Sequence, residues 1–139
     1  MEFSTEMKYV LDSIWLLISG CLVMWMAAGF SMLEAGLVRT KNTTAILTKN
    51  ITLYAVACVA YYFVGYNLMY GSGNDFIGAG VLMSGTSTDG HSLLSDFFFQ
   101  VVFAATAASI VSGTVAERIK FWPFMGFTLI LTSIIYPIQ

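Results

Sequence analysis

Four long apolar stretches, separated by short polar segments, dominate the sequence. They cover about residues 13–37, 44–69, 97–116 and 121–139. A helix needs roughly 20 apolar residues to cross the hydrocarbon core of a bilayer, and each stretch is about long enough. Backbone polar groups in lipid must be satisfied within their own segment, which favours helices over open strands. The pattern therefore predicts an all-α fold, a polytopic transmembrane helical bundle.

Residue types at the edges of the stretches indicate where the helices begin and end. The Asp-Ser pair at 12–13 and the Ser-Asp pair at 95–96 are typical of helix N-caps. The Gly-Ser-Gly-Asn-Asp run at 71–75 is typical of a loop, so residues 71–95 are expected to connect the second and third helices. The Tyr-Pro pair at 136–137 predicts a stop or a kink near the end of the fourth.

The composition indicates that lipid is the solvent of this chain. Hydrophobic residues make up 58% of the sequence and charged residues 10%, whereas charged residues make up roughly 25% of soluble domains. A soluble domain of this size has too much surface to hide so many apolar side chains. Cys21 and Cys58 lie inside apolar stretches, where we expect them to pack as small hydrophobic residues. They form neither a metal-ligand spacing nor a disulfide framework.

The charged residues predict the orientation of the helices in the membrane. One side of the expected bundle carries most of the basic residues, namely Arg39, Lys41, Lys49, Arg118 and Lys120. The opposite side carries acidic residues, namely Asp12, Asp75, Asp89 and Asp96. The positive-inside rule places the basic side in the cytoplasm. The N-terminus is then outside, and residues 71–95 form an outer loop.

The third apolar stretch holds the candidate chemistry of the sequence. At roughly 100° per residue, one stripe of the helix carries Phe99, Phe103, Thr106, Ile110 and Gly113. The adjacent faces carry small residues at a spacing of four, which lets neighbouring helices approach closely. The two phenylalanines have two readings: ordinary packing, or a stacked aromatic constriction whose ring faces attract a cation.

Three further polar positions have alternative readings. Gln100 either bonds to another helix or caps the outer end of its own helix. Glu34 is an intramembrane carboxylate and hence a functional candidate, but it can also pair with Arg39 or Lys41 or face cytoplasmic water. Thr106 is a candidate pore or structural residue on the phenylalanine stripe. The Glu-Arg pair at 117–118 is expected to be a structural end-cap and anchor.

Two long motifs resemble those of a known family. Residues 28–42 read AGFSMLEAGLVRTKN, and residues 98–121 read FFQVVFAATAASIVSGTVAERIKF. In this order and spacing they resemble the first helix and the third helix of the ammonium transporter (Amt/MEP/Rh) family. The Tyr-Pro-Ile run at 136–138 matches the end of the family's fourth helix. The resemblance covers about residues 14–139.

The resemblance implies a fold, a function and roles for individual residues. It implies a protomer of about eleven helices, of which this chain holds about four, and a homotrimer in the cell membrane with its N-terminus outside. Ammonium would be recruited at an outer aromatic site and deprotonated, and ammonia and a proton would pass inward. Phe99 matches a residue of the recruitment site, Phe103 one ring of a stacked gate, and Gln100 the family's glutamine. Glu34 stands where other members have different residues, including tyrosine.

The family's pore histidines, pore aspartate and second gate phenylalanine have no counterpart in this sequence. We therefore expect a fragment that does not conduct alone. An alternative is the N-terminal part of an ammonium-sensing signal-transduction protein, and a third reading is a small membrane protein that helps to assemble a complex. The expected partners are ammonium or ammonia, lipid and a cytoplasmic regulatory protein, but no nucleic acid.

Neither enzymatic activity nor a cofactor nor a metal is expected. The sequence shows no glycine-rich phosphate loop, no pair of catalytic carboxylates and no nucleophile with its base. His91, the one histidine, lies in a polar loop.

Overall fold

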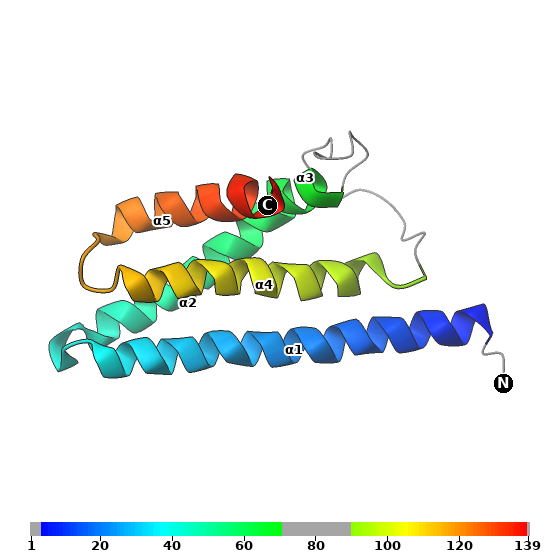
Figure 1. The fold of residues 1–139 in the computed structure, drawn as a ribbon, viewed down its shortest axis with the longest axis horizontal. Helices are drawn as coiled ribbons and strands as arrows, with labels where there is room; N and C mark the ends of the chain where they lie inside the picture. The colour runs from blue at the N-terminus through cyan, green and yellow to red at the C-terminus, as the bar shows by residue number, and fades with distance from the viewer. Residues whose placement is uncertain (1–3, 71–89, 139) are drawn as a thin grey trace.

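The computed structural model describes residues 4–70 and 90–138, and every regular element in these ranges is a helix (Figure 1). Four helical segments are long and apolar enough to cross a membrane: Thr5–Leu37, Thr40–Tyr70, Leu93–Thr114 and Phe121–Ile138. These segments confirm the predicted all-α transmembrane bundle.

The first span is one continuous helix, α1, which covers Thr5–Leu37. It begins before the apolar stretch does, because Glu6, Met7, Lys8 and Leu11 before this stretch are good helix formers. Ser4 is the N-cap, and its hydroxyl accepts a hydrogen bond from the Met7 amide at 3.4 Å. The predicted cap at 12–13 is wrong: Ser13 lies inside the helix, where its hydroxyl donates to the Tyr9 carbonyl at 2.7 Å.

The second span consists of four consecutive helical elements. They are the 3-10 turn η1 (Thr40–Asn42), α2 (Thr43–Ala60), the π-helical segment η2 (Tyr61–Gly65) and α3 (Tyr66–Tyr70). A wide π turn therefore interrupts the regular helix near one end of the span.

The third span is α4, which covers Leu93–Thr114. Ser92 occupies the N-cap position, so the predicted cap at 95–96 is wrong. Ser95 is buried inside the helix, and the Asp96 carboxylate accepts a hydrogen bond from the Tyr66 hydroxyl at 2.8 Å. Of the expected outer loop, the residues at 71–89 lie outside the described ranges, and those at 93–95 belong to α4.

The fourth span contains α5 (Phe121–Ile130), the π-helical segment η3 (Leu131–Ile135) and α6 (Tyr136–Ile138). Pro137 has no amide hydrogen to donate to the preceding turn. The sequence predicted a stop or a kink there. In the structure, the segment before Tyr136 is π-helical, and the helix continues through Pro137.

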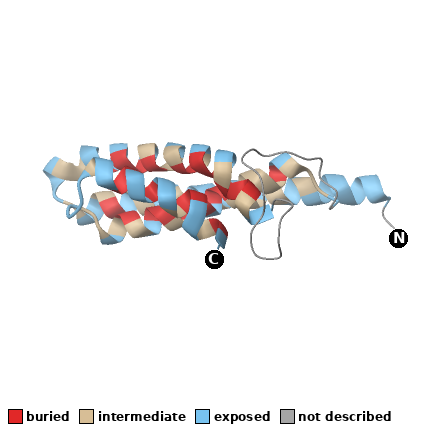
Figure 2. Ribbon diagram, turned by 90° about the horizontal axis from the view of Figure 1, so that it is seen from above, coloured by how far each residue is buried: buried red, intermediate tan, exposed pale blue. Residues whose placement is uncertain are grey.

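The third span is the most enclosed of the four. α1 and α2 both pack on α4, and Figure 1 shows α4 between α1 and α5 with α2 crossing behind. In the apolar part of α4, 44% of residues are buried, against 11% in α1. Figure 2 shows buried residues in the centre of the bundle and an exposed N-terminal end of α1. Small residues of α4 lie in this centre: Ala104, Ala105, Ala108, Ser109 and Ser112.

Candidate functional site

Two phenylalanines form an aromatic pair on one side of α4. The ring centroids of Phe99 and Phe103 lie 5.0 Å apart with an angle of 69° between the planes. The side chain of Phe103 is 37% exposed, and Ile110, two turns further on, is also exposed. Gln100 is half-buried. The pair therefore borders a face that the described helices leave largely uncovered.

Thr106 differs from its neighbours on the predicted stripe. It is buried, and its hydroxyl donates a hydrogen bond to the Val102 carbonyl at 2.7 Å. Since this bond stays within one helix, Thr106 satisfies its own polar group inside the packed unit.

A buried ion pair joins the first two spans. The Lys49 ammonium nitrogen of α2 lies 3.6 Å from Glu34 Oε2 of α1, and their side chains are 7% and 2% exposed. Of the two readings of Glu34, the one in which it pairs with Arg39 or Lys41 or faces cytoplasmic water is therefore wrong. Arg39 follows the end of α1 at Leu37, where it interacts with Glu117 instead.

Two neutral side chains complete this arrangement. Asn50 donates its Nδ2 hydrogen to Glu34 Oε2 at 3.1 Å, and the Ser112 hydroxyl lies 3.2 Å from the same oxygen. The Lys49 ammonium donates to the Ser112 carbonyl at 3.4 Å and lies 5.1 Å from the centroid of the Phe124 ring. The buried polar cluster, as we call it, consists of these four polar residues and the ring beside them: Glu34, Lys49, Asn50, Ser112 and Phe124.

One feature of the sequence pointed to this cluster. Lys49 and Glu34 are both charged residues inside predicted spans, and intramembrane charges usually pair with one another. Asn50 and Ser112 carry no such signal, because uncharged polar residues occur in many membrane helices. Their partnership depends on how α1, α2 and α4 cross.

A recess of about 410 Å³ opens beside the cluster. Its polar lining comes from Ser31, Asn50, Tyr54 and Ser109, and the remainder is apolar. Asn50 Nδ2 also lies 3.3 Å from the Ser31 hydroxyl, which links the recess to the cluster. The Tyr54 hydroxyl is buried without a hydrogen-bond partner in the part of the chain that the structure describes.

Glu117 ties together two turns at one end of the bundle. Its Oε1 accepts hydrogen bonds from the Arg39 amide at 3.1 Å and from Asn42 Nδ2 at 2.7 Å. These two donors hold the pKa of the Glu117 carboxyl below its ordinary value, with smaller contributions from the charges of Arg39 and Lys41. Glu117 has a φ of 62°, so the α4–α5 turn bends sharply here. The expected role of the pair at 117–118 as an end-cap agrees with this geometry.

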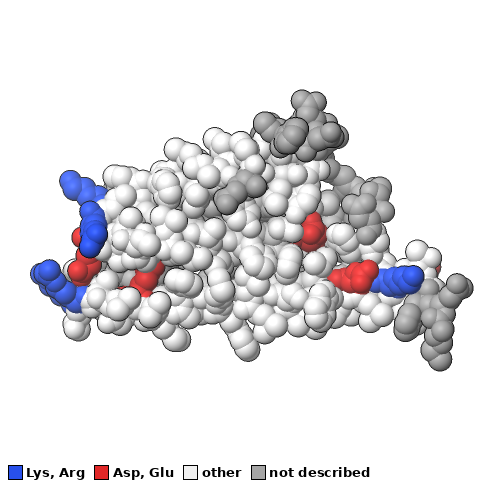
Figure 3. All heavy atoms as spheres, in the orientation of Figure 1, with Lys and Arg blue, Asp and Glu red and all other residues white. Residues whose placement is uncertain are grey.

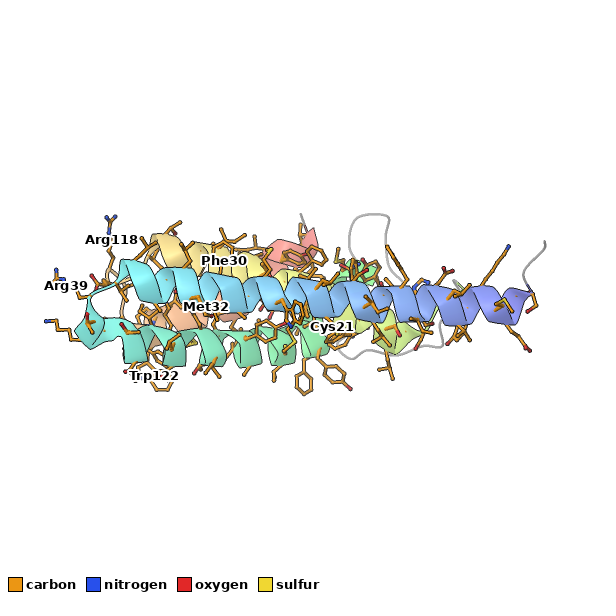
Figure 4. The ribbon with its side chains drawn as sticks, turned by 90° about the horizontal axis from the view of Figure 1, so that it is seen from below. Cys21, Phe30, Met32, Arg39, Arg118 and Trp122 are labelled. Carbon is orange, nitrogen blue, oxygen red and sulfur yellow. The ribbon has the colours of Figure 1, made fainter. Side chains whose placement is uncertain are left out.

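The charges are concentrated at the two ends of the molecule. Figure 3 shows basic side chains gathered at the end where the α1–α2 and α4–α5 turns lie. Arg39 and Arg118 both lie at this end in Figure 4. Large exposed apolar side chains, including Met32 and Trp122, line the flank between the ends. Cys21 of α1 is exposed on this flank, and both cysteines are free thiols.

Comparisons with known proteins agree with this architecture. The sequence pattern of the Ammonium Transporter Family matches residues 14–139. The chain is 45% identical over 129 residues to the ammonium transporter Amt2 of Archaeoglobus fulgidus, which covers 91% of this chain and 27% of that protein. It is 41% identical over 140 residues to ammonium transporter 3 of Dictyostelium discoideum, covering 98% of this chain and 31% of that one.

A solved structure is also similar. It is described as a Sensor Amt Protein and superimposes with a TM-score of 0.90 at 31% sequence identity, covering 97% of this chain and 34% of its own. The chain thus spans between a quarter and a third of the length of the curated relatives compared above. With four apolar spans and a family match over nearly its whole length, this chain is an integral membrane protein that belongs to the Ammonium Transporter Family.

Proposed function

We propose that these four spans contribute one wall of a path for ammonium or ammonia across the cell membrane. The aromatic pair of Phe99 and Phe103 carries this proposal, because its rings border the uncovered face of the most enclosed helix. An aromatic ring face attracts an ammonium ion electrostatically. A narrow apolar passage admits a neutral molecule more readily than a hydrated ion. We therefore assign these spans a role in transport.

The proposal includes an orientation and an assembly. The basic end with Arg39 and Arg118 faces the cytoplasm, and the N-terminus of α1 faces outward, as the positive-inside rule requires. Phe99, nearer the outer end, takes part in recruitment of the cation, with Gln100 beside it, and Phe103 narrows the path one turn further in. The homotrimer and the cytoplasmic regulatory protein that the family resemblance implies belong to this proposal as well.

A chimera tests the role of these helices. The corresponding spans of Archaeoglobus fulgidus Amt2 are replaced by residues 14–139, which match the family pattern, since the two proteins are 45% identical over 129 residues. Uptake of ammonium into proteoliposomes is then measured. We expect uptake by the chimera, and a change of at least about tenfold when Phe103 is replaced by alanine, because this removes about 1.4 kcal/mol or more of interaction with the passing species.

The control for Phe103→Ala must replace a phenylalanine with the same exposed fraction. Phe127→Ala on α5 meets this condition, since Phe127 is also 37% exposed. Phe97 is less suitable, because its ring packs against Tyr61, Tyr62 and Tyr66 with centroid distances of 6.1, 5.7 and 5.6 Å. Equal effects of Phe103→Ala and Phe127→Ala, or a correctly inserted chimera without uptake, would contradict the proposal.

A second candidate function is ammonium sensing. The similarity to the structure described as a Sensor Amt Protein favours it. A sensor built on these spans would bind ammonium and pass the signal to another domain without net uptake. Binding of ammonium to the inserted chimera in the absence of flux would support this alternative.

A further inference from the structure

The Lys49 ammonium is surrounded by the groups that recognise small organic cations. A carboxylate oxygen of Glu34 lies 3.6 Å away, and the Ser112 carbonyl oxygen lies 3.4 Å away. The ring of Phe124 faces the nitrogen with its centroid at 5.1 Å, within the range of a cation–π contact. Charge, hydrogen-bond acceptor and aromatic face therefore converge on one nitrogen atom.

These groups come from different helices and are held independently of the lysine. Glu34 belongs to α1, Ser112 to α4 and Phe124 to α5, and all three are at most 2% exposed. Asn50 Nδ2 and the Ser112 hydroxyl contact Glu34 Oε2 at 3.1 and 3.2 Å. These two contacts do not involve the lysine, so they can hold the carboxylate in place for another cation.

The carboxylate also retains an unused acceptor. Glu34 Oε1 is buried without a hydrogen-bond partner among the described residues. The three hydrogens of a lysine ammonium rotate about the Cε–Nζ bond, but the side chain restricts the position of the nitrogen. A free ammonium ion of similar size has no such tether, and it can turn one hydrogen toward Oε1.

We propose that Glu34, Ser112 and Phe124 form a binding site for a primary ammonium ion, which the chain fills with its own Lys49. Truncation of this lysine to alanine then opens a site for n-propylammonium, which has the atoms that the lysine side chain carries beyond Cβ. The site is separate from the proposed transport path. Phe103 and Ser112 lie about two and a half turns apart on α4, hence on opposite sides of that helix.

Chemical rescue tests this site. Lys49→Ala is purified in detergent, and its melting temperature is measured with n-propylammonium chloride or with sodium chloride at the same ionic strength. We expect the variant to melt below the wild-type chain, because a buried carboxylate has lost its counter-charge. Propylammonium should restore at least about half of the lost melting temperature, with a saturating dose dependence.

Matched controls separate this site from general salt or solvent effects. Lys41→Ala removes an exposed lysine from the adjacent η1 turn, and it should show no rescue. 1-Propanol has nearly the same size as propylammonium but no charge, and it should not rescue Lys49→Ala. The double variant Glu34→Gln/Lys49→Ala lacks the carboxylate, and it should not respond to propylammonium. Rescue by 1-propanol, rescue of the double variant, or a folded Lys49→Ala that ignores propylammonium would overturn the proposal.

A measurement on the unaltered chain decides the matter if Lys49→Ala does not fold. In the nitrogen-15 spectrum of the lysine side chains, the Lys49 ammonium should exchange its hydrogens slowly with water, since the side chain is only 7% exposed. Phe124→Leu should shift this signal by removing the ring current. A Lys49 signal that exchanges as fast as those of the exposed Lys8 and Lys41 would show that no enclosed site exists.

Discussion

At the scale of single residues, one carboxylate joins turns that are far apart in the sequence. Glu117 accepts hydrogen bonds from the Arg39 amide and the Asn42 side chain, and this interaction lowers the pKa of its carboxyl. The folded chain therefore binds a proton at this site less readily than the unfolded chain does. The stabilisation is fully present above the ordinary pKa of 4.5 and is lost as the pH falls through the lowered folded value.

Hydrogen exchange of the Arg39 amide follows this loss. We expect protection of this amide, corrected for the intrinsic pH dependence of exchange, to be constant above pH 4.5 and to decrease at lower pH. Glu117→Gln keeps a carbonyl acceptor but has no titrating group, so its protection should not depend on pH over the same range. An equal decrease in both proteins would mean that another group controls the turn.

The sequence alone predicted some of the roles of these residues. The sequence indicated that Glu117 lies at the end of the third span and that the aromatic pair shares one stripe of its helix, because both follow from local position along the chain. It did not indicate the partners of Glu117, which lie in a distant turn. It did not indicate that Glu34 pairs with Lys49. The partner of a charge inside the membrane depends on the crossing of two helices, and neither composition nor spacing specifies that crossing.

At the scale of elements, the two π-helical segments contact each other across the bundle. Gly65, the last residue of η2, allows this contact. A Cβ atom at this position would lie 2.7 Å from the Thr132 carbonyl oxygen of η3 and 2.4 Å from the Tyr61 ring. The sequence predicted the irregular turn near Pro137, which lacks an amide hydrogen. It gave no signal for η2, where every residue can form a regular helix.

Gly65→Ala should therefore destabilise the bundle. We expect a loss of about 1–3 kcal/mol in the free energy of unfolding, measured by titration with a denaturing detergent, because the added methyl group forces η2 and η3 apart. Gly126→Ala on α5 is the matched control, since a Cβ there meets no atom within 4 Å. It should change stability by at most about 1 kcal/mol, in the direction of greater stability. Similar losses in both variants would show that helix contact is not the cause.

At the scale of the whole molecule, the separation of charge defines an orientation. Lys8 and Lys41 are exposed lysines near opposite ends of α1. Lys41 belongs to the η1 turn, at the end that we assign to the cytoplasm, whereas Lys8 lies in the first turns of α1, near the N-terminus.

Labelling with a membrane-impermeant maleimide tests this orientation. Lys8→Cys and Lys41→Cys are each introduced into a chain whose Cys21 and Cys58 are replaced by alanine. We expect Lys8→Cys to react in intact cells and Lys41→Cys to react only after the membrane is opened. Reaction of both positions from the same side would contradict both the orientation and the transmembrane course of α1.

The ion pair between Glu34 and Lys49 has a consequence for biosynthesis. A charged side chain raises the free energy of insertion of its helix, by roughly 2.5–3.5 kcal/mol for Arg, Lys or Asp at the centre of a bilayer. Because the two charges lie in consecutive helices, they can meet as soon as the ribosome has released this hairpin, before α4 is translated. The hairpin of the first two spans therefore brings its own counter-charge into the bilayer.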